Sequence, residues 1–109
     1  MFYTYSQNNS GGSFSFDKRD GITHMVIIEA ENHHEANSKA ESVGLYFDGS
    51  GDCPCCGNRW DEIDKSDGKN KPEVYGKSPK DFVKDGSTLW MKKGFEVCVH
   101  YKDGRKEWF

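Results

Sequence analysis

Aromatic residues fall into two short runs near the N-terminus, at residues 2–6 and 13–17, and polar turn-forming residues occupy positions 7–12 between them. Aromatic side chains favour β-strands, whereas Asn, Ser and Gly favour turns. We therefore expect the two runs to pair as a β-hairpin.

A continuous apolar run lies within residues 23–30. Side chains alternate between the two faces of a strand, so both faces of this one would carry apolar residues. Met25 and Ile27 belong to one face, and Val26 and Ile28 to the other. The pattern predicts a central strand that is covered on both faces.

The period of the apolar residues then changes to that of a helix. Small apolar residues recur at intervals of four and three, at Ala36, Ala40 and Val43. Asn32 is a suitable N-cap, with Glu35 three residues later as a capping box requires, and Gly44 supplies the C-terminal stop. Because this helix is short and its apolar stripe is narrow, it needs the sheet beneath it.

The last residues predict a second hairpin. Residues 95–102 and 105–109 are separated by Asp103 and Gly104, a pair that tolerates the positive φ angles of a two-residue type I′ turn. In residues 95–102, Cys98 and His100 would share one face.

Residues 61–87 are mostly Asp, Lys, Gly, Asn and Pro, which predicts a polar, loop-rich insertion. Ile63, Val74 and Tyr75 are the scattered residues that could anchor it to the core. All these elements predict one α+β domain over residues 1–109, with a single antiparallel sheet of about five or six strands, one packed helix and a cysteine-rich knuckle.

Composition adds the nature of the core and excludes some classes of protein. Aromatic residues outnumber Val, Ile and Leu together, so large rings must fill the core. The formal net charge of -3 provides no strong field to hold a nucleic acid. The longest apolar run, residues 25–28, is far too short to span a bilayer, and the N-terminus lacks the pattern of a secretion signal.

The cysteines suggest a metal site. Cys53 and Cys56 form a C-x-x-C knuckle followed by a glycine, and two thiolates at this spacing converge on one ion. Cys98 and His100 could complete a Cys3His set of ligands, and Cys55 could replace any of the thiolates. Four protein ligands leave no position for water, so the zinc that we expect would be structural.

Other interpretations of the cysteines remain open. An even number of cysteines is compatible with disulfides in an exported protein. Cys98 could be an ordinary buried thiol, with His100 facing only Glu107 across the hairpin. A cysteine nucleophile would need a neighbouring base such as a histidine.

Two segments are candidates for binding a ligand or partner. The glycine-containing loop has the composition of a backbone nest that surrounds an anion; its residues are Asn8, Asn9, Ser10, Gly11 and Gly12. Arg59 and Trp60 could form a cation and aromatic pair at a partner surface, or they could pack the cysteine loop onto the sheet. None of the common nucleotide-binding or hydrolase motifs is present.

Two segments carry a resemblance to a known family, namely FYTYSQNNSGGSF at residues 2–14 and DCPCCGNRW at residues 52–60. Together with the strand and helix between them, they resemble a family of small, functionally uncharacterised proteins that are encoded largely by bacteriophages. The resemblance covers about the first 60 residues and implies no catalytic residues. It implies a phage protein in the cytoplasm of a bacterial host, where such accessory proteins commonly redirect or inhibit host machinery, including defence systems.

These observations favour a non-enzymatic phage accessory protein that binds and inhibits or sequesters a host component, either a protein or a small nucleotide signal. The alternative is a small structural-zinc domain that binds nucleic acid. A third hypothesis is a cysteine- or metal-dependent hydrolase. Exposed aromatic residues would also be compatible with a homodimer.

Overall fold

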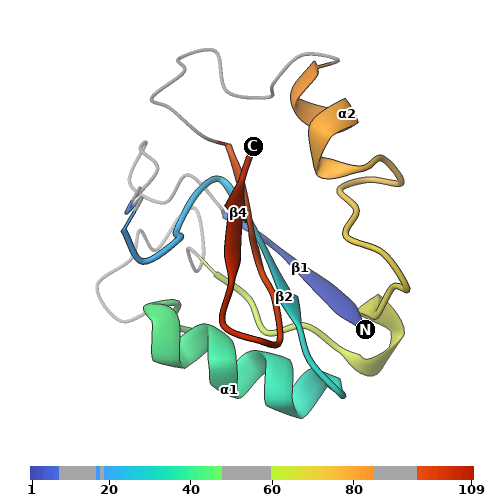
Figure 1. Cartoon of the computed structure of the whole chain (residues 1–109). Helices are drawn as coiled ribbons and strands as arrows, with labels where there is room; N and C mark the ends of the chain where they lie inside the picture. The colour runs from blue at the N-terminus through green and yellow to red at the C-terminus, as the bar shows by residue number, and fades with distance from the viewer. Residues whose placement is uncertain (8–16, 18, 48–59, 85–95) are drawn as a thin grey trace, which may run out of the picture.

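The computed structural model describes residues 1–7, 17, 19–47, 60–84 and 96–109 of the chain (Figure 1). They form one mixed sheet with a main helix packed on it. The four described strands are β1 (Phe2–Ser6), β2 (Met25–Glu29), β3 (Val97–His100) and β4 (Lys106–Trp108). They lie side by side in the order β1-β2-β3-β4.

The α+β class is confirmed, but the expectation of a purely antiparallel sheet is wrong. β1 pairs with β2 and β3 pairs with β4 in antiparallel fashion, whereas β2 and β3 are parallel. Parallel neighbours need a long crossover connection, and the chain between β2 and β3 contains α1 (His33–Val43). The apolar pattern of a strand is the same whether it pairs in parallel or antiparallel fashion, so the sequence does not predict the direction of this pairing.

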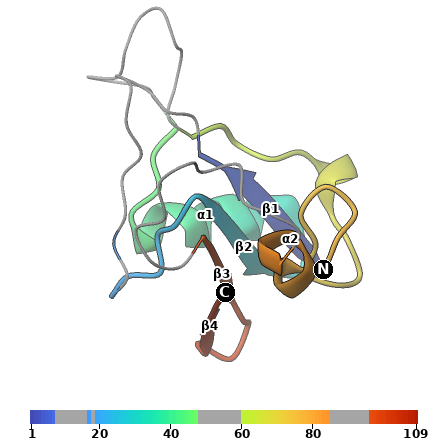
Figure 2. The same cartoon turned by 90° about the horizontal axis from the view of Figure 1, so that it is seen from above.

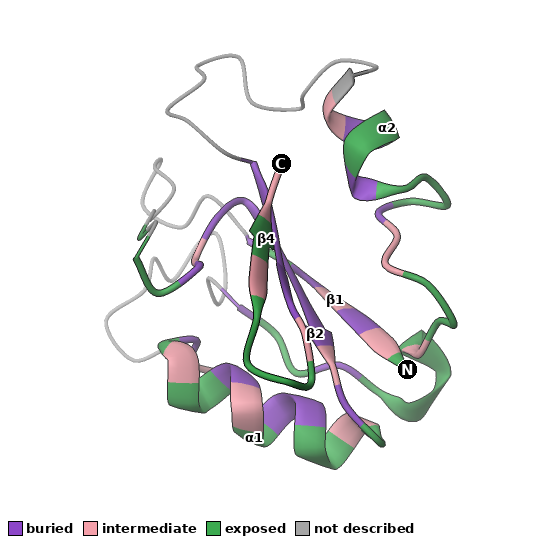
Figure 3. Cartoon of the chain, viewed as in Figure 1, coloured by how far each residue is buried: buried purple, intermediate pink, exposed green. Residues whose placement is uncertain are grey.

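Both faces of the sheet are covered, as the apolar run of β2 predicted (Figures 2 and 3). The face that we call the α1 face packs against the helix α1; its buried residues from β1 and β2 are Tyr3, Tyr5, Val26 and Ile28. The opposite face, the α2 face, packs against the six-residue helix α2 (Pro79–Lys84); its buried residues include Met25, Ile27, Val97, Val99 and Phe82.

The local signals for α1 are confirmed. The side chain of Asn32 accepts a hydrogen bond from the backbone N–H of Glu35 at 2.9 Å. Gly44 ends the helix with φ of +121°, and its N–H bonds back to the last turn. The predicted capping box is half formed, because the Glu35 carboxylate accepts from the N–H of Glu31 at 3.4 Å.

A buried amide joins α1 to the sheet and to the segment after residue 60. The Asn37 Oδ1 atom accepts hydrogen bonds from the Tyr5 hydroxyl at 2.9 Å and from the Ile63 N–H at 3.2 Å. Its Nδ2 atom donates to the Ile63 carbonyl at 3.2 Å. Three segments that are distant in sequence therefore meet at one side chain.

The C-terminal hairpin is present, but its turn differs from the two-residue prediction. The Tyr101 N–H donates to the Arg105 carbonyl at 2.8 Å, so the loop has three residues, 102–104, and His100 lies opposite Lys106 instead of Glu107. In this loop Gly104 alone has a positive φ, +92°. Asp103 avoids the second positive φ of a type I′ turn, and its carboxylate accepts the N–H of Arg105 at 3.0 Å.

The N-terminal hairpin prediction lies partly outside the described residues. Residues 13–16 are not described, and β1 pairs with β2 through register pairs such as Tyr3 with Ile28. The predicted insertion, residues 61–87, contains the short 3-10 helix η2 (Lys65–Asp67) and α2. Of its expected anchors, Ile63 and Val74 are buried, whereas Tyr75 is exposed. Among the helices that the structure describes, none is long and apolar enough to cross a membrane.

Candidate functional site

Cys98 and His100 lie together on the α1 face of β3, as the alternation of the strand predicted. Both side chains are buried against Gly21, which precedes β2 and has φ of +74°. A Cβ atom on Gly21 would lie 2.6 Å from His100 Cε1 and 2.9 Å from Cys98 Sγ. Only glycine therefore allows the backbone to approach this pair.

The hydrogen bond of His100 indicates which ring nitrogen is free for another partner. His100 Nε2 lies 2.9 Å from the Gly21 carbonyl, which can only accept, so Nε2 carries the proton. Nδ1 then keeps its lone pair. An imidazole that donates one N–H to a backbone carbonyl is the usual arrangement of a histidine that binds a metal.

Burial controls the protonation of both groups. It raises the pKa of the Cys98 thiol to about 12, against smaller opposite effects of Lys106 and of the Glu107 backbone. Burial also lowers the pKa of His100, against the opposite effect of the hydrogen bond to Gly21. In the absence of a metal, the pair is a neutral thiol beside a neutral imidazole.

Two further titratable groups are buried near the start of β3. Glu96 is 1% exposed, and neither of its carboxylate oxygens has a hydrogen-bond partner among the described residues. Burial lowers the pKa of His24, and the charge of Glu96 acts in the opposite direction. Within residues 1–7, 17, 19–47, 60–84 and 96–109, no three His, Cys, Asp or Glu side chains are arranged to hold a metal ion.

The other predicted metal ligands, Cys53 and Cys56, lie outside the described residues. The same holds for Arg59 and for the predicted anion-binding loop, residues 8–12. Trp60 is described and is 2% exposed, in the core of the α1 face. Its position agrees with the packing interpretation, because its ring is covered by other core residues.

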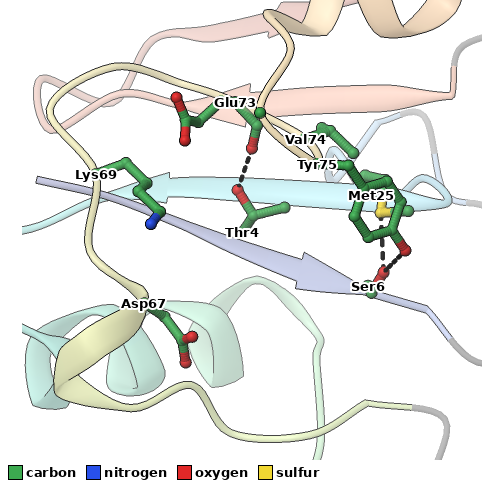
Figure 4. Close-up of a pocket in the computed structure, with 9 residues that line it drawn as sticks. Thr4, Ser6, Met25, Asp67, Lys69, Glu73, Val74 and Tyr75 are labelled. Carbon is green, nitrogen blue, oxygen red and sulfur yellow. Dashed lines mark hydrogen bonds between the residues drawn. The ribbon is translucent and has the colours of Figure 1, made fainter.

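A surface pocket of about 440 Å³ lies on the other side of the sheet, between β1 and residues 67–76 (Figure 4). Two hydroxyl side chains of β1 line it, and Met25 and Val74 form its apolar part. The Thr4 hydroxyl donates to the Glu73 carbonyl at 2.7 Å, and the Ser6 hydroxyl donates to Met25 Sδ at 3.1 Å. Pockets of this size accommodate small ligands or single side chains.

Tyr75 lies at the rim of this pocket in a conformation that is rare for its type. Its φ is +52° and that of Gly76 is +81°, while Val74 and Lys77 exchange both backbone hydrogen bonds across the turn. These are the features of a two-residue type I′ turn, whose first position favours Asn or Gly. Tyr75 is nevertheless 74% exposed. Its ring centroid lies 6.1 Å from that of Phe82, and its hydroxyl lies 3.4 Å from Ser6 Oγ.

Charged side chains complete the rim. Lys69 contributes an ammonium group, while Asp67 and Glu73 contribute carboxylates. Asp67 Oδ2 accepts the N–H of Asp64 at 2.8 Å and so belongs to the capping of η2. Lys69 and Glu73 have no side-chain partner in the described part of the chain, and both remain available to a ligand.

The pattern of residues along the chain does not indicate this pocket. Its charged residues lie in the segment that was predicted as a polar insertion, and only the structure shows that this segment folds back against β1. The signal that could have been used is an aromatic residue directly before a glycine, Tyr75-Gly76, within a polar segment.

Comparison with known proteins yields a family but no characterised relative. No curated protein and no solved structure matches the chain. The family model for a domain of unknown function (DUF7296) matches residues 1–109, and the chain belongs to this family.

Proposed function

We propose that the protein is a non-enzymatic binding protein, a phage accessory protein that binds and inhibits or sequesters a host component in the bacterial cytoplasm. The phage context comes from the sequence resemblance, and the binding role is supported by the pocket beside β1. One observation carries the proposal, namely the exposed ring of Tyr75 in a left-handed backbone conformation at the rim of that pocket.

The conformation of Tyr75 is unfavourable for folding. A left-handed conformation costs a residue other than glycine about 1 to 2 kcal/mol. Burial offsets little of this cost, because Tyr75 is 74% exposed and its ring has only a tilted contact with Phe82. An unfavourable conformation that presents an aromatic ring beside hydroxyl groups and unpaired charges is typical of a binding site.

The state of Cys98 gives less support to a thiolate enzyme. The nucleophile in such enzymes is the thiolate, which requires a lowered thiol pKa. Burial instead raises the pKa of Cys98 to about 12, so the thiol stays protonated at neutral pH. This residue is better suited to packing or to binding a metal.

We further propose a structural zinc ion bound by Cys53, Cys56, Cys98 and His100. Its support in the described residues is the juxtaposition of Cys98 and His100 over Gly21, with His100 Nδ1 free for another partner. Zinc would displace the Cys98 proton, because a coordinated thiol is bound as the thiolate. The nucleic-acid alternative has less support, since Trp60 is buried.

The binding role can be tested by capture from host cells. The tagged full chain, a Tyr75→Asn variant and a Lys65→Ala control are purified from a bacterial host, and mass spectrometry identifies bound proteins and released small molecules. Asn tolerates the left-handed conformation, so Tyr75→Asn removes the ring and keeps the turn. Lys65 is an exposed residue of η2 that does not line the pocket.

We expect one component to be enriched by the wild type and by Lys65→Ala, and to be lost with Tyr75→Asn. Steep weakening of the capture with salt, together with recovery of nucleic acid, would support the zinc-domain alternative instead. Recovery of the same components with all three proteins would show that the pocket beside β1 does not bind them.

A further inference from the structure

The outer edge of β1 is only partly paired in the described residues. Met1 and Ala30 exchange both backbone hydrogen bonds, and the Gln7 N–H donates to the His24 carbonyl. The backbone N–H and C=O groups of the odd-numbered residues in this segment therefore point toward β2. The backbone groups of the even-numbered residues must point away from β2, since the N–H and C=O groups of successive residues alternate in direction along a strand. Phe2 does so, and it exchanges both of its hydrogen bonds with Lys69.

This outer ladder stops after one pair. The next outward-facing residues are Thr4 and Ser6, and their backbone N–H and C=O groups have no backbone partner in the part of the chain that the structure describes. An unpaired strand edge is a template for a further strand. The side chains of Thr4 and Ser6 line the pocket, so a strand added here would place alternate side chains on the pocket side of the sheet (Figure 4).

The charges of the pocket indicate which side chain would fit. Asp67 and Glu73 provide two carboxylates, and Lys69 provides one ammonium group. This balance favours a cation and disfavours the phosphates of a nucleotide. The exposed ring of Tyr75 provides a face on which an ammonium or guanidinium group can lie.

We propose that the open edge of β1 binds an extended segment of a partner protein, which pairs with Thr4 and Ser6 and places a Lys or Arg side chain in the pocket that Asp67, Glu73 and Tyr75 line. The backbone hydrogen bonds hold the segment, and the pocket selects its basic residue. This inference rests on the proposed binding function, and it assigns the partner to proteins instead of nucleotides.

A displayed library of linear peptides, selected on the immobilised full chain, tests the inference. Selected peptides are then synthesised, and their affinities are measured for the wild type, Thr4→Pro, Glu73→Gln and Lys65→Ala. Thr4→Pro removes the edge N–H, and proline is tolerated on an edge strand where that N–H faces outward. Glu73→Gln removes the charge and keeps the shape of the side chain. Because the Glu73 carboxylate has no partner in the described residues, this variant should fold, and its affinity can be measured even if Thr4→Pro unfolds.

We expect the selected peptides to share one Lys or Arg residue in an extended sequence. Their affinity should fall about tenfold or more in Glu73→Gln and in a folded Thr4→Pro, and stay unchanged in Lys65→Ala. Selection without a common basic residue, or equal affinity for all four proteins, would overturn the inference. So would saturable binding of AMP that competes with the peptides, or a dimer of the chain that Thr4→Pro dissociates, since a second copy would then occupy the edge.

The capture experiment separates this inference from the proposed function. If a host component is captured through Tyr75 but the selected peptides do not displace it, the binding function stands and the peptide assignment fails. If the peptides displace it, both are supported. If no component depends on Tyr75 and the peptides also fail to bind, both are rejected.

Discussion

Gly21 shows how much one residue contributes to the buried pair on the α1 face. It combines a positive φ with close approach to Cys98 and His100. Gly104 also has a positive φ, but nothing lies within 4 Å of the position of its missing Cβ. A comparison of the two positions therefore distinguishes the cost of a left-handed backbone from the cost of a steric clash.

We expect Gly21→Ala to lower the free energy of unfolding by about 3 kcal/mol, and Gly104→Ala by about 1 kcal/mol. Both variants share the strain of a left-handed alanine, and only the first forces side chains apart. Urea unfolding of the two variants measures the difference. Equal losses would mean that Cys98 and His100 do not pack on Gly21 as described.

Substitution of Tyr75 is expected to change the free energy of unfolding in the opposite direction. Tyr75→Asn should raise the free energy of unfolding by about 1 kcal/mol, because Asn is favoured in the turn that Tyr75 occupies. Thermal unfolding measures the change, and Tyr75→Phe, which keeps the strain, should leave stability nearly unchanged. A less stable Tyr75→Asn protein would show that the ring is needed for folding, and it would remove the argument for a binding role.

Single residues differ in how far the sequence could predict them. The common face of Cys98 and His100 follows from the alternation of side chains along any strand. The contact with Gly21 joins residues almost eighty positions apart, and no local pattern records it. Tyr75 is an expected anchor of the insertion, whereas in the structure it is 74% exposed and has a left-handed backbone conformation.

At the scale of elements, the amide of Asn37 joins α1 to β1 and to residue 63. Asn37→Ala would leave the Tyr5 hydroxyl and both backbone groups of Ile63 without a partner. We expect this variant to lose about 3 kcal/mol of stability, because each buried group without a partner costs about 1 to 3 kcal/mol.

The matched control is Ser38→Ala on the exposed side of the same helix, which should change stability by less than about 0.5 kcal/mol. Chemical denaturation of both variants, followed by circular dichroism, provides the comparison. Similar stabilities for Asn37→Ala and the wild type would show that water replaces the amide, and that the connection is not important for the fold.

The elements also differ in how far the sequence could predict them. α1 was predicted closely because its signals, Asn32 and Gly44, act within one turn of the backbone. The turn of the C-terminal hairpin was not, since Asp103 and Gly104 fit both a two-residue and a three-residue loop. The parallel pairing of β2 with β3 depends on the path of the chain between them, which the pattern within each strand does not encode.

At the scale of the whole molecule, one question is what stabilises a domain with so few aliphatic residues. The structure covers both faces of β2, and aromatic residues such as Tyr3, Tyr5 and Trp60 fill the α1 face. The proposed zinc ion would add to this core from the same face, where Cys98 and His100 lie.

We expect the protein purified without chelator to contain equimolar zinc, and Cys53→Ser and Cys98→Ser to lose it. Cys55→Ser is the control that should retain it. Removal of the ion should lower the melting temperature, because the binding free energy of a structural zinc contributes to folding. Elemental analysis measures the bound zinc, and thermal unfolding measures the change in melting temperature. A zinc-free protein whose melting temperature is unaffected by chelators would contradict the proposal.

The affinity of the protein for the component recovered by capture tests the central claim, binding at the pocket beside β1. Isothermal titration calorimetry compares the wild type with Tyr75→Asn and Lys65→Ala. We predict that Tyr75→Asn binds about tenfold more weakly or worse, while Lys65→Ala binds like the wild type. Equal affinities for the three proteins, or a wild type that recovers no component, would contradict the account.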